Sequence, residues 1–254
     1  MSSNRFLDKV VLVTGGGTGI GRATARAFAR EGATVAVAGR SADDLAQTVK
    51  LIEQDGGDAS FVTADVTVED DVVRMVDTTV RRHGALHVAH NNAGVFGQTG
   101  PLADLDTDTW RRVLEVNLTG VFLSMKHEIQ HMRAHGGGAI INTASNIGAH
   151  LRLPGMASYA TAKAGVSILT RAAARDHIGE GVRINAVSPG AADGPMSTLP
   201  GETREQRDAR LAPTIPVGRV GTLDEVAATV LWLAFEEAGF AVGHDLVIDG
   251  GATA

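Results

Sequence analysis

The chain has 254 residues, 44% of them hydrophobic and 20% charged, with a net charge of −6; this composition excludes a disordered chain and allows a large buried core. Acids and bases are scattered, which argues against nucleic acid or an anionic membrane as partner, because both favour a concentrated basic surface. The absence of cysteine excludes disulfides and thiolate metal sites. The sequence has no apolar run typical of a signal peptide or a membrane span, so we expect a cytoplasmic protein.

Short apolar strands alternate with helices along the whole chain. Strands are predicted at residues 10–14, 34–38, 59–64, 88–90, 139–143, 183–187 and 246–248, and helices at 21–31, 42–55, 69–83, 108–134, 158–178 and 224–234. Continuous apolar strands that alternate with helices are typical of a parallel sheet covered on both faces. We therefore expect an α/β fold with one doubly wound, seven-stranded parallel sheet, in a single domain over residues 1–254.

A long stretch without a predicted element runs from Gly190 to Gly221 and mixes prolines, glycines and charges. Irregular segments of this length in a compact domain are often lids over a site. We expect residues 190–221 to form a substrate lid, and residues 190–213 to be mobile when no dinucleotide is bound.

A glycine-rich segment follows the first predicted strand. It reads Thr14-Gly15-Gly16-Gly17-Thr18-Gly19-Ile20-Gly21 and leads directly into a predicted helix. Glycines let backbone amides approach a pyrophosphate closely, and a helix N-terminus offers free N–H groups and the positive end of its dipole. The position between a strand and a helix makes this segment a more specific signal than glycines alone. It predicts a dinucleotide-binding turn.

Tyr159 and Lys163 lie four residues apart on a predicted helix, so they share one face of it. A free tyrosine has a pKa of about 10, which is too high for a base near neutrality. A neighbouring ammonium group favours the phenolate and lowers that pKa. Ser145 follows the fifth predicted strand, at the sheet edge where doubly wound proteins bind ligands. The three residues predict an acid/base site in which Tyr159 exchanges a proton.

In order along the chain, the motifs resemble those of the classical short-chain dehydrogenase/reductase family. The resemblance rests on T-G-x-x-x-G-x-G at Thr14–Gly21, Asp65-Val66, Asn91-Asn92-Ala93-Gly94, Asn117, Ser145, Y-x-x-x-K at Tyr159 and Lys163, Ser188-Pro189-Gly190, and Asp249-Gly250-Gly251. It implies a Rossmann-type fold and a homotetramer. It also implies that Ser145 stabilises the substrate oxygen, Tyr159 donates or accepts the proton, Lys163 binds the nicotinamide ribose, and Asn117 positions a water that relays protons.

The resemblance further implies which residues bind the dinucleotide. They are Gly15, Gly17, Thr18, Gly19, Ile20, Gly21, Arg40, Asp65, Val66, Asn92, Ala93, Gly94, Tyr159, Lys163, Pro189, Gly190 and Ala192. Gly39 stands where NAD-binding proteins carry a carboxylate for the ribose 2′-OH, and the Arg40 guanidinium suits a 2′-phosphate. NADP(H) is therefore favoured over NAD(H). Against this, Thr18 is neutral at a position where many NADPH-dependent relatives carry a basic residue. An alternative role for Arg40 is to stack on the adenine ring.

The pattern departs from the family in two places. Gly194 replaces a threonine that often holds the nicotinamide carboxamide, and the spacing from Ser145 to Tyr159 is one residue longer than in many members. The extra residue falls in the loop at residues 149–154, which we expect to wall the substrate pocket. The candidate substrate residues are Val95, Phe96, Asn146, Leu153 and Met196, and most of them are apolar. They suit a moderately hydrophobic ketone or alcohol.

His127-Glu128-Ile129-Gln130-His131 matches the zinc-protease motif H-E-x-x-H. However, a helix that rises about 1.5 Å per residue places His131 roughly 21 Å beyond Asn117. These histidines therefore belong to the opposite end of the sheet, and no metal site is expected.

The sequence thus predicts an NADP(H)-dependent oxidoreductase of a small ketone or secondary alcohol. One alternative is a reductase of acyl-carrier-bound 3-oxo thioesters, which would want a basic surface for its acidic carrier, whereas Arg204, Arg207 and Arg210 alternate with acids. The other is a non-catalytic dinucleotide sensor, a class that usually lacks the tyrosine or the lysine.

Overall fold

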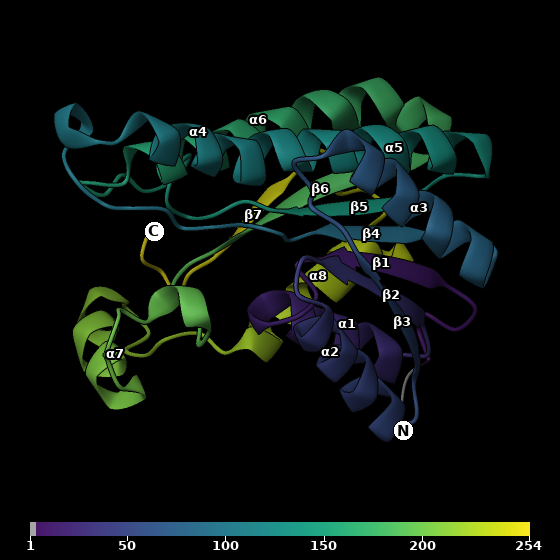
Figure 1. The fold of residues 1–254 in the computed structure, drawn as a ribbon, viewed down its shortest axis with the longest axis horizontal. Helices are drawn as coiled ribbons and strands as arrows, with labels where there is room; N and C mark the ends of the chain where they lie inside the picture. Colours follow the sequence, from purple (N-terminus) through teal and green to yellow (C-terminus); the bar gives the residue numbers. More distant parts are fainter. Residues whose placement is uncertain (1–3) are drawn as a thin grey trace.

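The computed structural model describes residues 4–254, which form a seven-stranded parallel sheet between two layers of helices (Figure 1). The strand order is β3-β2-β1-β4-β5-β6-β7, so the direction of winding reverses between β1 and β4. Ligands of such sheets bind at this reversal, outside the carboxyl ends of the strands. The predicted Rossmann-type α/β fold is confirmed.

The strands in the middle of the sheet are buried on both faces. The seven strands are β1 (Val10–Thr14), β2 (Thr34–Gly39), β3 (Asp58–Thr63), β4 (Val88–Asn91), β5 (Gly138–Thr143), β6 (Val182–Pro189) and β7 (Asp245–Ile248). Every residue of β1 and β4 is buried. This explains why their sequences are apolar without the alternation of a half-exposed strand.

Each face of the sheet has its own helices and its own core (Figure 1). One face is covered by α1 (Gly19–Arg30), α2 (Ala42–Gln54) and α8 (Leu223–Ala234), and the other by α3 (Glu69–His83), α5 (Gly120–Ala134) and α6 (Ala157–His177). Phe28 and Ile52 belong to the first core, whereas Met75 and Met132 belong to the second. None of the helices in residues 4–254 has the length and apolar character needed to cross a membrane.

Two helical segments differ from the sequence prediction. The helix expected over residues 108–134 is divided into α4 (Thr107–Leu114), a π-helical turn (Glu115–Thr119) and α5. The lid segment, expected to be irregular, contains α7 (Arg204–Leu211). This helix is polar nearly throughout, so it lacks the apolar periodicity that reveals a helix. In Figure 1, α7 stands apart from both helical layers; the mobility of the lid stays a prediction.

Candidate active site

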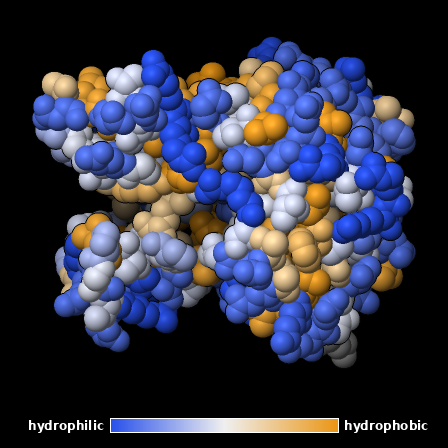
Figure 2. Space-filling view, viewed as in Figure 1, coloured by the Kyte–Doolittle hydropathy of each residue, from blue (hydrophilic) through white to orange (hydrophobic). Residues whose placement is uncertain are grey.

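A cleft of about 450 Å³ opens at the point where the strand order reverses. It is lined by the predicted residues Gly15, Gly17, Thr18, Arg40, Asp65, Val66, Ala93, Gly94 and Val95, together with Gly39, Ser41, Asp44, Leu45, Ala64 and Val116. Figure 2 shows the molecule deeply hollowed between the lobe that carries α7, at the lower left, and the remainder of the surface.

The glycine turn after β1 packs backbone against backbone. Gly15 has a φ of +64°, and a Cβ there would lie 2.9 Å from the Ala93 Cα atom. A Cβ at Gly21 would collide with the carbonyl oxygen of Gly15. The Thr14 hydroxyl accepts hydrogen bonds from the backbone N–H groups of Asn92 (3.0 Å) and Ala93 (3.2 Å). Asn92 and Gly21 therefore support the turn, while Gly15 and Ala93 line the cleft.

The N-terminus of α1 fits a pyrophosphate. Its N-cap residue, Thr18, makes no side-chain capping bond, and the first turn contains no acidic residue. Free N–H groups and an uncompensated positive dipole end therefore face the glycine turn. Gly19 and Ile20 form the start of this helix. The predicted dinucleotide-binding residues thus fit the diphosphate of NAD(P).

The ribose end of the cleft carries charges of both signs. The Arg40 guanidinium is exposed and makes no hydrogen bond or ion pair within residues 4–254. Asp44 of α2 lines the same cleft, and a Cβ on Gly17 would lie 2.9 Å from its Cβ atom. The sequence motifs do not indicate Asp44. The Ser41 hydroxyl caps α2 by accepting from the Asp44 N–H, which places Asp44 in the first turn of the helix, next to Gly17.

Asp65 follows β3 and keeps its carboxylate ionised. Burial would raise the pKa of Asp65, but hydrogen bonds from the Thr67 backbone N–H (3.0 Å) and hydroxyl (2.8 Å) outweigh it and lower the pKa. Arg40 adds electrostatic attraction. An ionised acceptor at this position suits the amino group of adenine in the dinucleotide that Asp65 is expected to bind.

Ser145, Tyr159 and Lys163 come together from the end of β5 and from α6. Tyr159 is only 8% exposed. Burial raises the pKa of its phenol, and a hydrogen bond with the Ser145 hydroxyl opposes this rise. Burial also lowers the pKa of Lys163 to about 8. The Lys163 Nζ atom donates to the Thr143 carbonyl oxygen (2.6 Å) and lies 5.9 Å from the centre of the Tyr159 ring.

The phenol is therefore protonated in the protein alone near neutral pH. This protonation state suits a proton donor, the role needed when a ketone is reduced. The sequence led us to expect a Tyr159 pKa lowered by Lys163, whereas in the structure burial raises it; the lowering by Lys163 stays a prediction.

Asn117 lies fully buried in the π-helical turn. Its Nδ2 atom donates to the Val95 carbonyl oxygen (2.7 Å), and its Oδ1 atom accepts from the Val95 N–H (3.0 Å). A Cβ on Gly94 would lie 2.7 Å from Oδ1. Asn117 thereby fixes the segment that lines the cleft after β4, and its role in a proton relay stays a prediction.

The candidate substrate residues divide into three groups. Phe96 lies with its ring 4.9 Å from the Tyr159 ring, and Val95 packs on the same small cluster, to which Tyr159 belongs. Leu153 and Met196 are 40% and 48% exposed. Asn146 is buried, and its amide donates to Asp249 (3.3 Å). Val95 and Phe96 therefore supply an apolar wall next to the phenol.

The segment after β6 connects the site to the lid. The Asn146 N–H donates to the Pro189 carbonyl oxygen (3.1 Å), and Gly190 packs against Asp249. Ala192 pairs with Gly221 across the base of the lid. These contacts hold Pro189, Gly190 and Ala192 beside the Ser145 end of the site.

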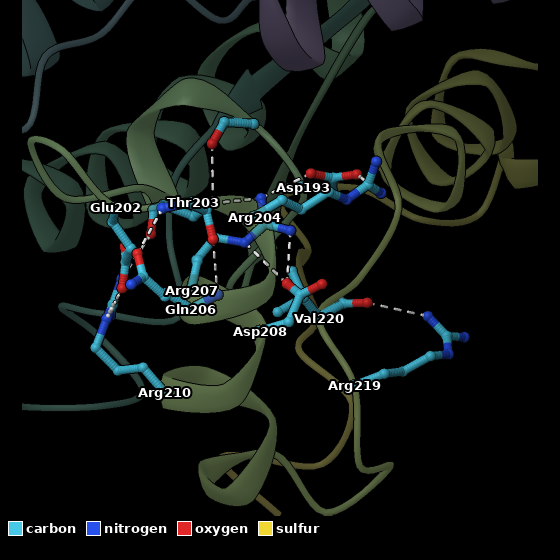
Figure 3. A network of polar contacts seen from close by, with 12 residues as sticks. Asp193, Glu202, Thr203, Arg204, Gln206, Arg207, Asp208, Arg210, Arg219 and Val220 are labelled. Carbon is cyan, nitrogen blue, oxygen red and sulfur yellow. Dashed lines mark hydrogen bonds and ion pairs between the residues drawn. The ribbon is translucent and has the colours of Figure 1, made fainter.

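Ion pairs hold the lid together, as Figure 3 shows. Asp193 accepts from Arg204 and from Arg207 (2.6 Å), whose side chain is only 3% exposed. Arg210 pairs with Glu202 (2.7 Å). The arginines of α7 are thus neutralised within the lid.

The residues of the zinc-protease motif point in different directions. His127 contacts Glu69 (3.0 Å) on the surface, while Glu128 is fully buried and accepts from the Asn91 amide (2.8 Å). The His131 ring stacks on that of the histidine four residues later. Within the described residues, no three His, Cys, Asp or Glu side chains are placed to hold a metal ion. Burial raises the pKa of Glu128 to about 7, although the bond from Asn91 opposes it.

Known proteins resemble this chain over nearly its whole length. A sequence model of the family described as enoyl-(acyl carrier protein) reductase matches residues 15–253. Cis-4-hydroxycyclohexanecarboxylate dehydrogenase of Sinomonas cyclohexanicum is 43% identical over 98% of both chains. Cyclohexanol dehydrogenase of an Acinetobacter species is 39% identical over 99% of this chain and 97% of its own. The crystal structure of levodione reductase matches with a TM-score of 0.93, at 34% identity over 98% of both chains.

Proposed function

The chain belongs to the short-chain dehydrogenase/reductase family and is an oxidoreductase of CH–OH groups, and on this premise we propose that it transfers a hydride between NADP(H) and a secondary alcohol or ketone on a cyclohexane ring. The observation that carries the proposal is the meeting of Ser145, Tyr159 and Lys163 next to Gly94, a residue of the dinucleotide cleft where a Cβ would lie 3.7 Å from Lys163 Nζ. Related dehydrogenases named for cyclohexanol and a hydroxycyclohexanecarboxylate support the substrate class.

The proposed roles follow from the protonation states of the side chains. The dinucleotide, when bound, supplies or accepts the hydride. Tyr159 donates its phenolic proton to the carbonyl oxygen in reduction and accepts the hydroxyl proton in oxidation. Ser145 holds the substrate oxygen against Tyr159. Lys163, charged below a pKa of about 8, attracts the anionic dinucleotide and favours the phenolate.

The apolar wall suits a cyclohexane ring. Val95 and Phe96 lie against Tyr159 and offer the ring carbons a surface without hydrogen-bonding groups. A ring held there has its oxygen directed to the polar pair Ser145 and Tyr159. Burial of the ring carbons contributes roughly 25 cal/mol per Å² of apolar surface, a moderate affinity for so small a substrate.

Arg40 supports NADP(H) over NAD(H). It is an exposed guanidinium at the cleft that makes no hydrogen bond or close ion pair in the described part of the chain and attracts Asp65 only at longer range, so its N–H groups are open to a 2′-phosphate. Asp44 lines the same cleft and opposes a phosphate by charge repulsion, while it could accept from a free 2′-OH. The preference for NADP(H) therefore depends on the Arg40 interaction being the stronger of the two.

The proposal is tested with the purified protein, NADP⁺ or NAD⁺, and cyclohexanol, and in the reverse direction with cyclohexanone and each reduced dinucleotide. We expect the absorbance of the reduced dinucleotide to change with cyclohexanol and NADP⁺, and Tyr159→Phe to abolish this change. Turnover that survives in Tyr159→Phe would refute the acid/base role. A preference for NAD⁺ would refute the role of Arg40 and leave the reaction class intact.

Two comparisons favour the acyl-carrier alternative, the description of the matching family model and a relative from Thermotoga maritima, 37% identical over 97% of this chain, that is named 3-oxoacyl-[acyl-carrier-protein] reductase. The lid arginines oppose it, because Asp193 and Glu202 already neutralise Arg204, Arg207 and Arg210. Activity with acetoacetyl-CoA well above that with cyclohexanone would favour this alternative. The homotetramer and the cytoplasmic location stay predictions.

A further inference from the structure

Asp245, the first residue of β7, has a carboxylate with no exposed surface. The hydroxyl of Ser188 donates to Oδ1 (2.5 Å), and the hydroxyl of Ser167 donates to Oδ2 (2.6 Å). His150 Nε2 lies 2.9 Å from the same Oδ2. A buried carboxylate requires donors to remain ionised. Since a carboxylate only accepts, the proton of the third bond belongs to His150 Nε2.

The donors belong to different segments of the proposed site. Ser167 lies one helical turn after Lys163 on α6, and its hydroxyl also contacts the Lys163 carbonyl oxygen (3.3 Å). Ser188 is near the end of β6, directly before the segment that enters the lid. His150 belongs to the loop after Ser145, the loop that is one residue longer than in many family members. Asp245 therefore joins three segments that are distant in the sequence.

Backbone hydrogen bonds restrain the loop that connects Ser145 to His150. The Leu151 N–H donates to the Asn146 carbonyl oxygen (2.6 Å), and the Gly148 N–H donates to that of Leu151 (2.8 Å). Gly148 has a φ of +135° and packs on α6, where a Cβ would lie 2.8 Å from the Ala160 carbonyl oxygen. The closed loop leaves His150 as the side chain that ties its far side to the sheet.

The near side of the loop sets the direction of the Ser145 hydroxyl. The Ile147 N–H donates to Ser145 Oγ (3.1 Å). This bond occupies an acceptor site of the oxygen and leaves its proton to be donated, in the protein alone to the Tyr159 phenol oxygen. A substrate oxygen that gains negative charge needs such a donor.

We propose that His150 and Asp245 are positioning residues that hold the loop at residues 146–151 and thereby direct the Ser145 hydroxyl toward the substrate oxygen; the inference rests on the proposed function of Ser145. Loss of the His150–Asp245 bond releases the far side of the loop, and the Ile147 N–H shifts relative to Ser145. None of the residues that line the dinucleotide cleft belongs to this loop, so the cleft is left unchanged.

The experiment compares His150→Ala with His150→Gln, whose amide N–H can replace the imidazole donor. We expect kcat with cyclohexanol to fall about 10- to 100-fold in His150→Ala, since small displacements at a site have effects of this size, and the KM of the dinucleotide to stay within about twofold. His150→Gln recovers most of kcat. The matched control is His177→Ala, which removes a histidine–carboxylate contact with Glu180 (2.7 Å) at the far end of α6.

The second arm is Asp245→Leu, which keeps about the size of the side chain and has no acceptor, combined with His150→Ala in a double variant. The loss in the double variant should be no larger than that in Asp245→Leu alone, because both changes break the same bond. If Ser145→Ala abolishes activity while His150→Ala keeps full kcat, the positioning role is wrong and the proposed function stands. If Ser145→Ala keeps full activity, both are wrong. If His150→Gln is as impaired as His150→Ala, the hydrogen bond is not the cause.

Discussion

Glu128 is buried in the core without a cation beside it, and this makes the stability of the protein depend on pH. Burial raises its pKa from 4.5 to about 7. As pH rises, the Glu128 carboxyl ionises in the unfolded chain before it does so in the folded protein. The free energy of unfolding therefore falls between pH 4.5 and about 7 and stays lower by the full amount above that range. The pKa difference of about 2.5 corresponds to about 3 kcal/mol at roughly 1.4 kcal/mol per tenfold change.

Glu128→Gln removes this deficit at nearly constant shape. The amide oxygen still accepts from Asn91 Nδ2, and the amide nitrogen replaces Oε1, which has no partner in the described residues. We expect the variant to be more stable than the wild type by up to about 3 kcal/mol at pH 8 and nearly equal to it at about pH 5.

The assay is urea unfolding at several pH values, with Glu53→Gln on the exposed side of α2 as the control. The control should follow the wild type at every pH. If the difference between Glu128→Gln and the wild type is the same at about pH 5 and pH 8, the buried side chain is not a neutral acid and the reasoning fails.

Three further predictions concern the site and the lid. Arg40→Ala should raise the KM for NADPH about 10- to 100-fold and that for NADH by less than about twofold, since a charge-assisted bond contributes about 1.5–3 kcal/mol; equal effects in steady-state kinetics would contradict the assignment. Lys163→Met should abolish turnover yet raise the free energy of unfolding near pH 7 by up to about 3 kcal/mol, because burial disfavours the charged lysine and lowers its pKa from 10.5 to about 8. Chemical denaturation measures this change, and an unchanged or lower stability would contradict it. Asp193→Asn should weaken the ion pairs with Arg204 and Arg207, so that limited proteolysis cuts residues 190–221 faster; an unchanged rate would show that other contacts hold the lid.

The sheet and most helices could be predicted because their signals are local. A run such as Val10–Thr14 is apolar since it is buried on both faces, and it ends at glycines that cannot extend it. The α7 helix was not predicted, because its buried face consists of Arg207 rather than apolar residues. Its capping box was nevertheless visible, since Thr203 and Gln206 stand three residues apart.

The site could be predicted only as far as its motifs reach. The order of the motifs led to the residues that line the cleft, such as Gly15 and Gly94, because a backbone that must approach a ligand closely requires glycine. Asp44 was missed, since its place in the cleft depends on how α2 packs against the glycine turn. The bonds between Asp245 and His150 or Ser188 span 95 and 57 positions. Nothing local in the sequence indicates such pairs.

Three of the buried ionisable side chains in residues 4–254 show how burial separates structural charges from functional ones. Asp245 is surrounded by donors, so its charge is satisfied by the fold itself. Glu128 has a single donor and is satisfied best as a neutral acid. Lys163 has one backbone acceptor and a lowered pKa, so the fold alone leaves its charge incompletely compensated. An anionic ligand in the adjacent cleft would complete that compensation, which is why Lys163, of the three, is the residue whose charge a dinucleotide can use.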